Sequence, residues 1–149
     1  MALQSPPTSE ERAERLLLAS TDADVRGWAQ DCLPPAVTLC GFADSGSDVA
    51  ELARRSQVDV CLLDMGLPGD ALAALRAVTE SAPAARVVAW AESDDHPSLL
   101  EAIAAGAIGC IVGTPDCEAL ARTLADVVAG KPTLPPAVVT RIVSQLRLL

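Results

Sequence analysis

The sequence predicts a single α/β domain, in which helices cover both faces of a parallel sheet. From Arg15 onward, apolar runs alternate five times with segments of helical period, the order typical of such domains. The apolar runs are nearly continuous, as strands buried on both sides require. At 149 residues, half of them hydrophobic, the chain is long enough for one domain with its own core. Since only 2% of the residues are aromatic, Ala, Val, Leu and Ile must fill that core.

Five short apolar runs are the strand candidates. They are separated by turn residues and are too short for helices of ordinary length. Trp90 falls within the fourth run and is expected to fill the core. The expected strands are residues 16–19, 37–43, 58–63, 87–91 and 108–112.

Five segments between and after these runs carry apolar residues at helical spacing, so each predicts a helix with one buried face. In the fifth, Thr114 is expected to cap the helix and Pro115 to begin it. The expected core faces are Val25, Trp28, Ala29, Cys32 and Leu33 in the first helix; Val49, Leu52 and Ala53 in the second; Leu72, Leu75 and Val78 in the third; Leu99, Leu100, Ile103 and Ala104 in the fourth; and Leu120, Leu124, Val127 and Val128 in the fifth.

Both ends of the chain depart from this pattern. Residues 1–14 are expected to be a flexible lead-in, and residues 15–130 the domain itself. Residues 131–149 are expected to be a linker and a further helix over 137–149. That helix either packs on the domain, forms a dimer contact or leads into a segment beyond the chain. Its apolar residues are Val138, Val139, Ile142, Val143 and Leu146.

The charge and the cysteines exclude several functions. A net charge of −9 argues against direct binding of nucleic acid, whose phosphates require Lys and Arg. No apolar run reaches the ~20 residues that span a membrane, and the polar start is unlike a signal peptide. We therefore expect a cytoplasmic protein with no membrane partner. Five cysteines without a C-x-x-C pair, and His96 as the only histidine, favour small buried hydrophobic residues over redox or zinc chemistry.

Several acids collect where the predicted strands end. This is the edge at which open parallel sheets place their functional residues. The acids indicate either a cation site or helix capping, and the second interpretation is favoured because acids are ordinary at helix starts. His96, before a proline, is expected in a solvated turn. The acids are Asp22, Asp44, Asp70, Glu92, Asp94, Asp95 and Asp116.

One stretch resembles a known family. Val-Asp-Val-Cys-Leu-Leu-Asp64-Met-Gly-Leu-Pro68-Gly69 is similar to the third strand and following turn of bacterial response-regulator receiver domains. The Ser93-Asp-Asp95 loop, the segment 99–112 and Leu134-Pro-Pro resemble the NarL/FixJ subfamily in particular. The likeness covers about residues 15 to 140. It implies a CheY-like, flavodoxin-like sheet in strand order 2-1-3-4-5 with an extra C-terminal helix.

The resemblance also implies a phosphorylation site in which most of the family's functional residues are replaced. Receiver domains accept a phosphoryl group on the aspartate that ends the third strand, which corresponds to Asp64, and they use Mg²⁺ to neutralise it. Asp22 lies one residue past the family's acidic pair and is expected to start the first helix. The only lysine, Lys131, follows the fifth helix and is expected near the opposite edge of the sheet. The substituted positions are Ser20 and Thr21 for the acidic pair, Ala91 for a hydroxyl residue, Cys110 for an aromatic residue and Gly113 for a lysine.

The resemblance therefore implies the receiver domain of an atypical response regulator, without enzyme activity and without a cofactor. It would act by homodimerisation or by binding a regulatory protein, through the predicted fourth and fifth or first and fifth helices together with the helix over 137–149. DNA would be bound only by an absent C-terminal LuxR-type helix-turn-helix. Two alternatives remain: an Mg²⁺-dependent phosphoacceptor phosphorylated on Asp64 by a histidine kinase, and a flavodoxin-like domain that binds a small ligand.

Overall fold

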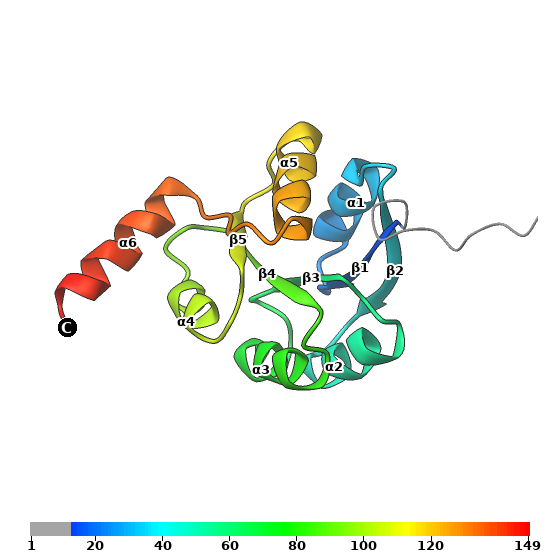
Figure 1. Ribbon diagram of the computed structural model, residues 1–149, viewed down its shortest axis with the longest axis horizontal. Helices are drawn as coiled ribbons and strands as arrows, with labels where there is room; N and C mark the ends of the chain where they lie inside the picture. Colours follow the sequence, from blue (N-terminus) through cyan, green and yellow to red (C-terminus); the bar gives the residue numbers. More distant parts are fainter. Residues whose placement is uncertain (1–12) are drawn as a thin grey trace, which may run out of the picture.

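The structure of the protein, a computed structural model, describes residues 13–149 (Figure 1). Within them a five-stranded sheet runs in the order β2-β1-β3-β4-β5, and every adjacent pair of strands is parallel. The predicted fold and strand order are confirmed. The strands are β1 (Glu14–Ala19), β2 (Val37–Ala43), β3 (Val60–Asp64), β4 (Arg86–Ala91) and β5 (Gly109–Val112).

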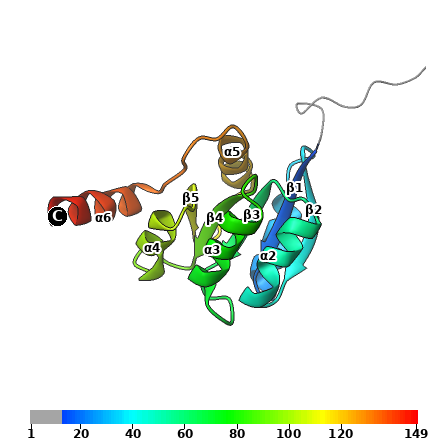
Figure 2. The same cartoon turned by 60° about the horizontal axis from the view of Figure 1, so that its bottom comes forward.

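Helices cover both faces of the sheet (Figures 1 and 2). One face carries α1 (Ala23–Cys32) and α5 (Cys117–Val128). The other carries α2 (Gly46–Arg55), α3 (Ala71–Ser81) and α4 (Ser98–Ala104). The last helix, α6 (Pro136–Arg147), extends away from the body of the domain beyond α4. No helix within residues 13–149 is both long and apolar enough to cross a membrane.

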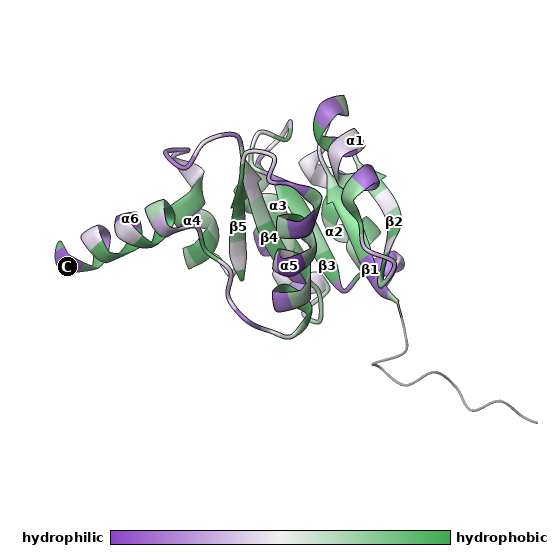
Figure 3. Ribbon diagram, turned by 90° about the horizontal axis from the view of Figure 1, so that it is seen from above, coloured by the Kyte–Doolittle hydropathy of each residue, from purple (hydrophilic) through white to green (hydrophobic). Residues whose placement is uncertain are grey.

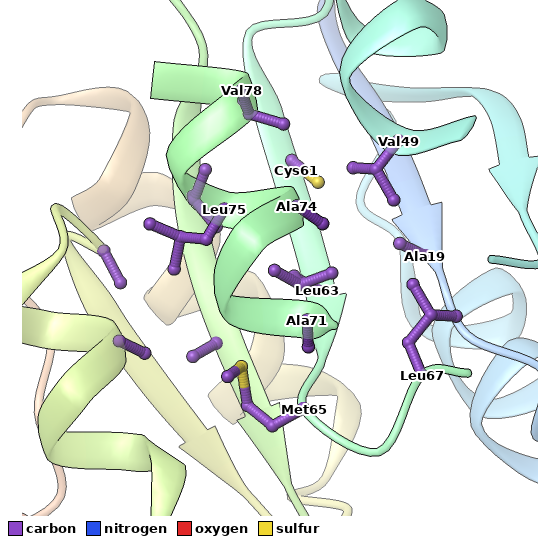
Figure 4. Close-up of a cluster of buried hydrophobic side chains, with 14 of the residues drawn as sticks. Ala19, Val49, Cys61, Leu63, Met65, Leu67, Ala71, Ala74, Leu75 and Val78 are labelled. Atoms are coloured by element: carbon purple, nitrogen blue, oxygen red, sulfur yellow. The ribbon is translucent and has the colours of Figure 1, made fainter. Parts of the chain in front are cut away.

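The core consists of two apolar layers, one on each side of the sheet, because alternate residues of a strand point to opposite faces. In β1, Leu16 and Leu18 pack toward α1 and α5, whereas Leu17 packs toward α2 and α3. Figure 4 shows the second layer around Leu63 and Leu75, with Met65 at its lower end. Each fully buried leucine contributes about 1.5–3 kcal/mol to folding.

Element boundaries differ from the sequence prediction where long-range hydrogen bonds decide them. β1 includes Glu14, whose amide donates to the Ala36 carbonyl, and residues 1–12 of the expected lead-in lie outside the described residues. β3 begins at Val60 rather than residue 58, because the Val58 amide donates to the Ala53 carbonyl at the end of α2.

Three of the acids at the strand ends cap helices, as the favoured interpretation predicted. Asp22, Asp70 and Asp116 are the N-caps of α1, α3 and α5, and each accepts a hydrogen bond from a backbone amide of the first turn. The predicted cap of the fifth helix, Thr114, was wrong by two residues. The Pro115 carbonyl accepts a hydrogen bond from the Trp28 indole instead, so the chain becomes helical only at Cys117.

The prediction that all five cysteines are small buried hydrophobic residues was wrong for two of them. Cys32, at the end of α1, and Cys117, at the start of α5, form a disulfide across 85 residues of sequence. Cys61 and Cys110 are free and buried as predicted, and Cys40 is free and half-buried. The disulfide was missed because its partners have no characteristic spacing, and only the packing of α1 against α5 brings them together.

The first half of α6 packs on the domain and the second half does not. Val138 is fully buried in the layer that contains α4, and Ile142 packs against the same layer. Val139, Val143 and Leu146 are exposed, and Figure 3 shows α6 as an arm of mixed hydropathy. The alternative in which this helix packs on the domain therefore holds for its N-terminal half.

Candidate functional site

The candidate site lies where β1, β3 and β4 end side by side. Asp64 is the last residue of β3, a strand buried along its whole length, and its neighbour in the register is Trp90 of β4. Because strand burial brings Asp64 into the domain, only 8% of this residue is exposed. This is the edge where parallel α/β sheets place their functional residues.

Both carboxylate oxygens of Asp64 have hydrogen-bond partners. The Ser20 hydroxyl donates to Oδ2 at 2.7 Å, and the Gly66 amide donates to Oδ1 at 2.8 Å. Ser20 is fully buried, and its hydroxyl also accepts a hydrogen bond from the Asp22 amide at 3.1 Å. Ser20 therefore joins the end of β1, the start of α1 and the candidate acceptor Asp64 into one network.

Asp22 serves the helix rather than Asp64. Its Oδ1 accepts from the Asp24 amide at 2.9 Å and from the Val25 amide at 3.4 Å, both in the first turn of α1. The expectation that Asp22 starts the first helix is confirmed. Its neighbour Thr21 is exposed at the rim.

Trp90 links the ends of β4 and β5. Its indole Nε1 donates to the Gly113 carbonyl at 2.6 Å, and the side chain is almost fully buried, as predicted. Gly113 has a φ of +68°, a conformation that residues with a side chain rarely adopt. The position that the resemblance assigns to a lysine therefore holds a glycine whose carbonyl is tied to an indole.

A cavity of about 270 Å³ opens above Asp64. It brings together Asp64, Thr21, Asp22 and Ala91 from the substituted site. Ser20 lies beneath it against Asp64, whereas Gly113 does not line it and Cys110 lines a different cavity with Thr133 and Leu134. The complete lining is Thr21, Asp22, Asp64, Gly66, Trp90, Ala91, Glu92 and His96.

Four lining residues were absent from the predicted phosphorylation site: Gly66, Trp90, Glu92 and His96. Gly66 lies in the turn that resembles the family, and Glu92 was expected among the acids at the strand ends because it directly follows β4. Trp90 lies within the strand and was predicted only as core. His96 carries no local signal: the loop folds back through a hydrogen bond from the His96 amide to the Ser93 carbonyl, and this turn brings the imidazole to the cavity.

The charges of the site do not suit a phosphoryl group. Three carboxylates, on Asp22, Asp64 and Glu92, line the cavity, and no Lys or Arg does. Lys131 is near the opposite edge, as predicted, because the adjacent Gly130 lies beside the Arg86 side chain at the start of β4. About two added negative charges would have to be held without a cationic side chain.

The site also fits Mg²⁺ poorly. Mg²⁺ prefers several oxygen ligands and usually one or two carboxylates in octahedral geometry. Here Ser20 and Thr21 supply neutral hydroxyls at the acidic-pair positions, and Asp22 is engaged by α1. Within residues 13–149, no group of three or more His, Cys, Asp or Glu side chains is placed to hold a metal ion.

Comparison with known proteins agrees with the fold. Residues 17–125 match the family described as the response regulator receiver domain. The chain is 28% identical to the nitrate/nitrite response regulator protein NarL of Escherichia coli over 116 residues, which are 77% of this chain and 54% of that protein. It is 30% identical to the response regulator GacA of Pseudomonas aeruginosa over 105 residues, 70% of this chain and 49% of that protein. The chain thus spans about half the length of the curated relatives it matches.

Solved structures share the same architecture. A two-component response regulator of the LuxR family from Aurantimonas superposes with a TM-score of 0.76 at 23% identity, covering 91% of this chain and 98% of that one. The receiver domain of the putative response regulator NarL from Mycobacterium tuberculosis gives a TM-score of 0.71 at 25% identity, covering 80% of this chain and 99% of that one. With the family match over residues 17–125, these likenesses lead to one conclusion: the chain belongs to the response regulator receiver domains, CheY-like in fold and of the NarL/FixJ type.

Proposed function

We propose that this chain is an atypical receiver domain that regulates through protein–protein contacts and without aspartyl phosphate. The observation that carries the proposal is the hydrogen bonding of Asp64: Ser20 and Gly66 already engage both carboxylate oxygens. Phosphorylation of either oxygen would disrupt the hydrogen bond to that oxygen, and the added charge would find no compensating cation in the lining of the cavity. The domain needs no enzyme activity and no cofactor for this role.

The Trp90 side chain gives independent support. In the orthodox switch that the resemblance describes, a lysine at position 113 would hold a phosphoryl oxygen. Here the Trp90 indole donates to the Gly113 carbonyl, which joins β4 to the loop after β5 in the unmodified protein. The strand ends are thus connected by a contact that needs no phosphoryl group.

Phosphorylation with a small-molecule donor tests the proposal. The chain is incubated with acetyl phosphate and Mg²⁺ and its intact mass is measured, with Asp64→Asn as the variant that lacks the acceptor. We expect the wild-type chain to remain unmodified like Asp64→Asn. Stoichiometric addition of one phosphoryl group to the wild type alone would refute the proposal and favour the alternative of a phosphoacceptor served by a histidine kinase.

A gain-of-function variant tests whether the substituted positions cause the expected inactivity. The triple variant Ser20→Asp, Thr21→Asp and Gly113→Lys restores the residue types that the resemblance assigns to these positions. The variant is expected to bind Mg²⁺ and to accept a phosphoryl group more readily than the wild type, since carboxylates and a cation would then surround Asp64. An equally inert triple variant with intact circular dichroism would show that the three substitutions are not the cause of inactivity.

The contacts through which the domain acts are proposed to be homodimeric or to a regulatory protein. The exposed Val139, Val143 and Leu146 of α6 support a contact surface that includes this helix, next to α4. Light scattering of the purified chain tests this. A dimer that becomes monomeric on Val143→Glu is the expected result, and a monomer at every concentration would limit the chain to other partners.

We further propose that the native protein is a cytoplasmic transcriptional regulator in which a C-terminal LuxR-type helix-turn-helix binds DNA. The match to about half of each curated relative and the LuxR-family description of one similar structure support this. With a net charge of −9, the chain itself is expected not to bind DNA. An electrophoretic mobility shift assay with the 149-residue chain should therefore show free DNA only, and a salt-dependent shift would contradict this assignment.

A further inference from the structure

The loop between β5 and α5, residues 113–116, and the first residue of α5 are held by side chains of two other elements. The Trp90 indole of β4 donates to the Gly113 carbonyl at 2.6 Å, and the Trp28 indole of α1 donates to the Pro115 carbonyl at 2.8 Å. Directly after the loop, Cys117 is bonded to Cys32 of α1. Both tryptophans of the chain and its disulfide thus converge on this loop.

The two residues joined by this bond differ in exposure. Cys117, the first residue of α5, is exposed, whereas Cys32 is 9% exposed and packs in the core layer shared by α1 and α5. The Cys117 side of the bond is therefore the side at which we expect a thiolate from solvent to attack.

The remaining cysteines are poorly suited to thiol chemistry. Burial raises the pKa of Cys61 to about 12 and that of Cys110 to about 11, so both thiols are protonated near neutral pH. Burial also raises the pKa of Cys40, whose sulfur donates to the Leu16 carbonyl. Since the thiolate is the reactive form, these three residues compete little with Cys32 and Cys117.

We propose that Cys32 and Cys117 form a thiol–disulfide exchange site, at which dithiol reductants break the bond and disulfide oxidants form it again. Breaking the bond removes the covalent link to α1 at the end of the loop between β5 and α5. In the cytosol, the compartment expected from the sequence, protein disulfides are typically transient or redox-sensing. The proposal is independent of whether Asp64 accepts a phosphoryl group.

The exchange proceeds in two steps. A thiolate of the dithiol reductant attacks the sulfur of Cys117, the bond to Cys32 breaks, and Cys32 leaves as a thiolate that takes up a proton. The second thiol of the reductant loses its proton and attacks the mixed disulfide, which releases Cys117 as a thiolate that is then protonated and leaves the reductant as a disulfide. The protein gains two electrons and two protons, and an oxidant of the disulfide class reverses both steps.

Reduction changes how the loop is held. It leaves the two indole hydrogen bonds and removes the covalent link to α1, so α5 can shift relative to α1 at its N-terminal end. Trp90 also lines the cavity above Asp64, which connects the loop to the candidate site. The redox state of the pair would therefore alter both the surface formed by α1 and α5 and the shape of the cavity.

Counting free thiols tests the bond and its accessibility. The folded chain is treated with oxidised glutathione or with dithiothreitol, quenched in acid and freed of reagent. It is then alkylated with iodoacetamide in urea at mildly alkaline pH and weighed. We expect three labels after oxidation, on Cys40, Cys61 and Cys110, and five after dithiothreitol. Five labels after oxidation would show that the bond does not form, and three after dithiothreitol would show that it is closed to reductants; either result overturns the proposal.

Tryptophan emission tests the effect on the loop, because both indoles contact it. Wild-type emission is expected to change on reduction. The emission of Cys32→Ser and of Cys117→Ser should resemble that of the reduced wild type and should not change when dithiothreitol is added. Cys40→Ser, a free cysteine outside the pair, is the matched control and should respond like the wild type. Identical emission of the oxidised and reduced wild type, with the label count changing from three to five, would refute the claim that the redox state of the pair alters the loop.

Discussion

Replacing Ser20 by alanine is expected to destabilise the domain measurably. The substitution removes the hydroxyl that donates to Asp64 at 2.7 Å and that accepts from the Asp22 amide at 3.1 Å. Ser20 is fully buried and Asp64 is 8% exposed, so solvent replaces the lost donor only through the cavity above Asp64. The carboxylate retains one protein partner, the Gly66 amide.

The expected loss is about 2 kcal/mol. Hydrogen bonds to charged groups contribute about 1.5–3 kcal/mol, and the remaining Gly66 bond and the open cavity place this one in the lower part of that range. For a chain of this size, about 2 kcal/mol corresponds to a fall in Tm of about 4–8 °C.

The chain contains a closely matched control in Ser93. Its hydroxyl donates to the Asp95 side chain at 2.6 Å and accepts from the amide of the same residue, but both residues are exposed. Ser93→Ala should therefore cost less than about 0.5 kcal/mol, since water replaces an exposed hydrogen bond at little cost. Urea denaturation followed by circular dichroism gives both free energies of unfolding from one protocol.

The decisive result is the difference between the two variants. If Ser20→Ala and Ser93→Ala lose the same stability within about 0.5 kcal/mol, burial does not strengthen the contact between Ser20 and Asp64, and the reasoning is wrong. A double-mutant cycle with Asp64→Asn then isolates the pair: a coupling free energy near zero would show that Ser20 stabilises the fold without acting on Asp64.

Three further predictions concern the scaffold. A Cβ added at Gly109 would clash with the Thr133 carbonyl oxygen, so Gly109→Ala should lower the free energy of unfolding by about 1–3 kcal/mol. Gly27→Ala in α1, with open space around it, should raise the free energy of unfolding by about 0.5–1 kcal/mol, and urea denaturation checks both variants. Asp116→Ala should cost about 1 kcal/mol in the same assay, because the Ala119 amide loses its capping partner at 2.8 Å, and an unchanged midpoint would exclude a capping role. Burial raises the pKa of Cys61 from 9.0 to about 12, so the folded state keeps the thiol proton at a pH where the unfolded chain has lost it. The contribution of Cys61 to the free energy of unfolding should therefore be full below pH 9 and fall as the pH rises toward 12. Cys61→Val should weaken this pH dependence in a series of thermal melts, and an unchanged pH dependence would assign it to other groups.

Patterns among neighbouring residues were sufficient to predict the architecture. The continuous apolar run before Asp64 identified a strand buried on both faces, and the spacing of Val25 and Ala29 identified the buried side of α1. Such patterns are readable because the period of a helix or strand repeats over residues adjacent in the chain. The resemblance around Asp64 then predicted that this residue ends the third strand, and in the structure it is the last residue of β3.

The contacts that define the candidate site required the tertiary structure. The bond between Ser20 and Asp64 spans 44 residues, that between Trp90 and Gly113 spans 23, and the disulfide joins residues 85 apart. No residue within either segment of such a pair signals its partner. Which side chains meet depends on the path of the whole chain, and each of these contacts contributes a free energy small compared with the burial that determines that path.

Residue patterns and the family resemblance thus predicted the class of fold and the strand order, and they indicated where residues typical of a phosphorylation site are replaced. How these replacements interact depends on the packing of the chain: Ser20 is hydrogen-bonded to Asp64, the Trp90 indole to the Gly113 carbonyl, and Cys32 is joined to Cys117. Periodicity and burial act on every residue of an element, whereas a hydrogen bond or a disulfide requires two particular atoms that the packing of distant segments brings together.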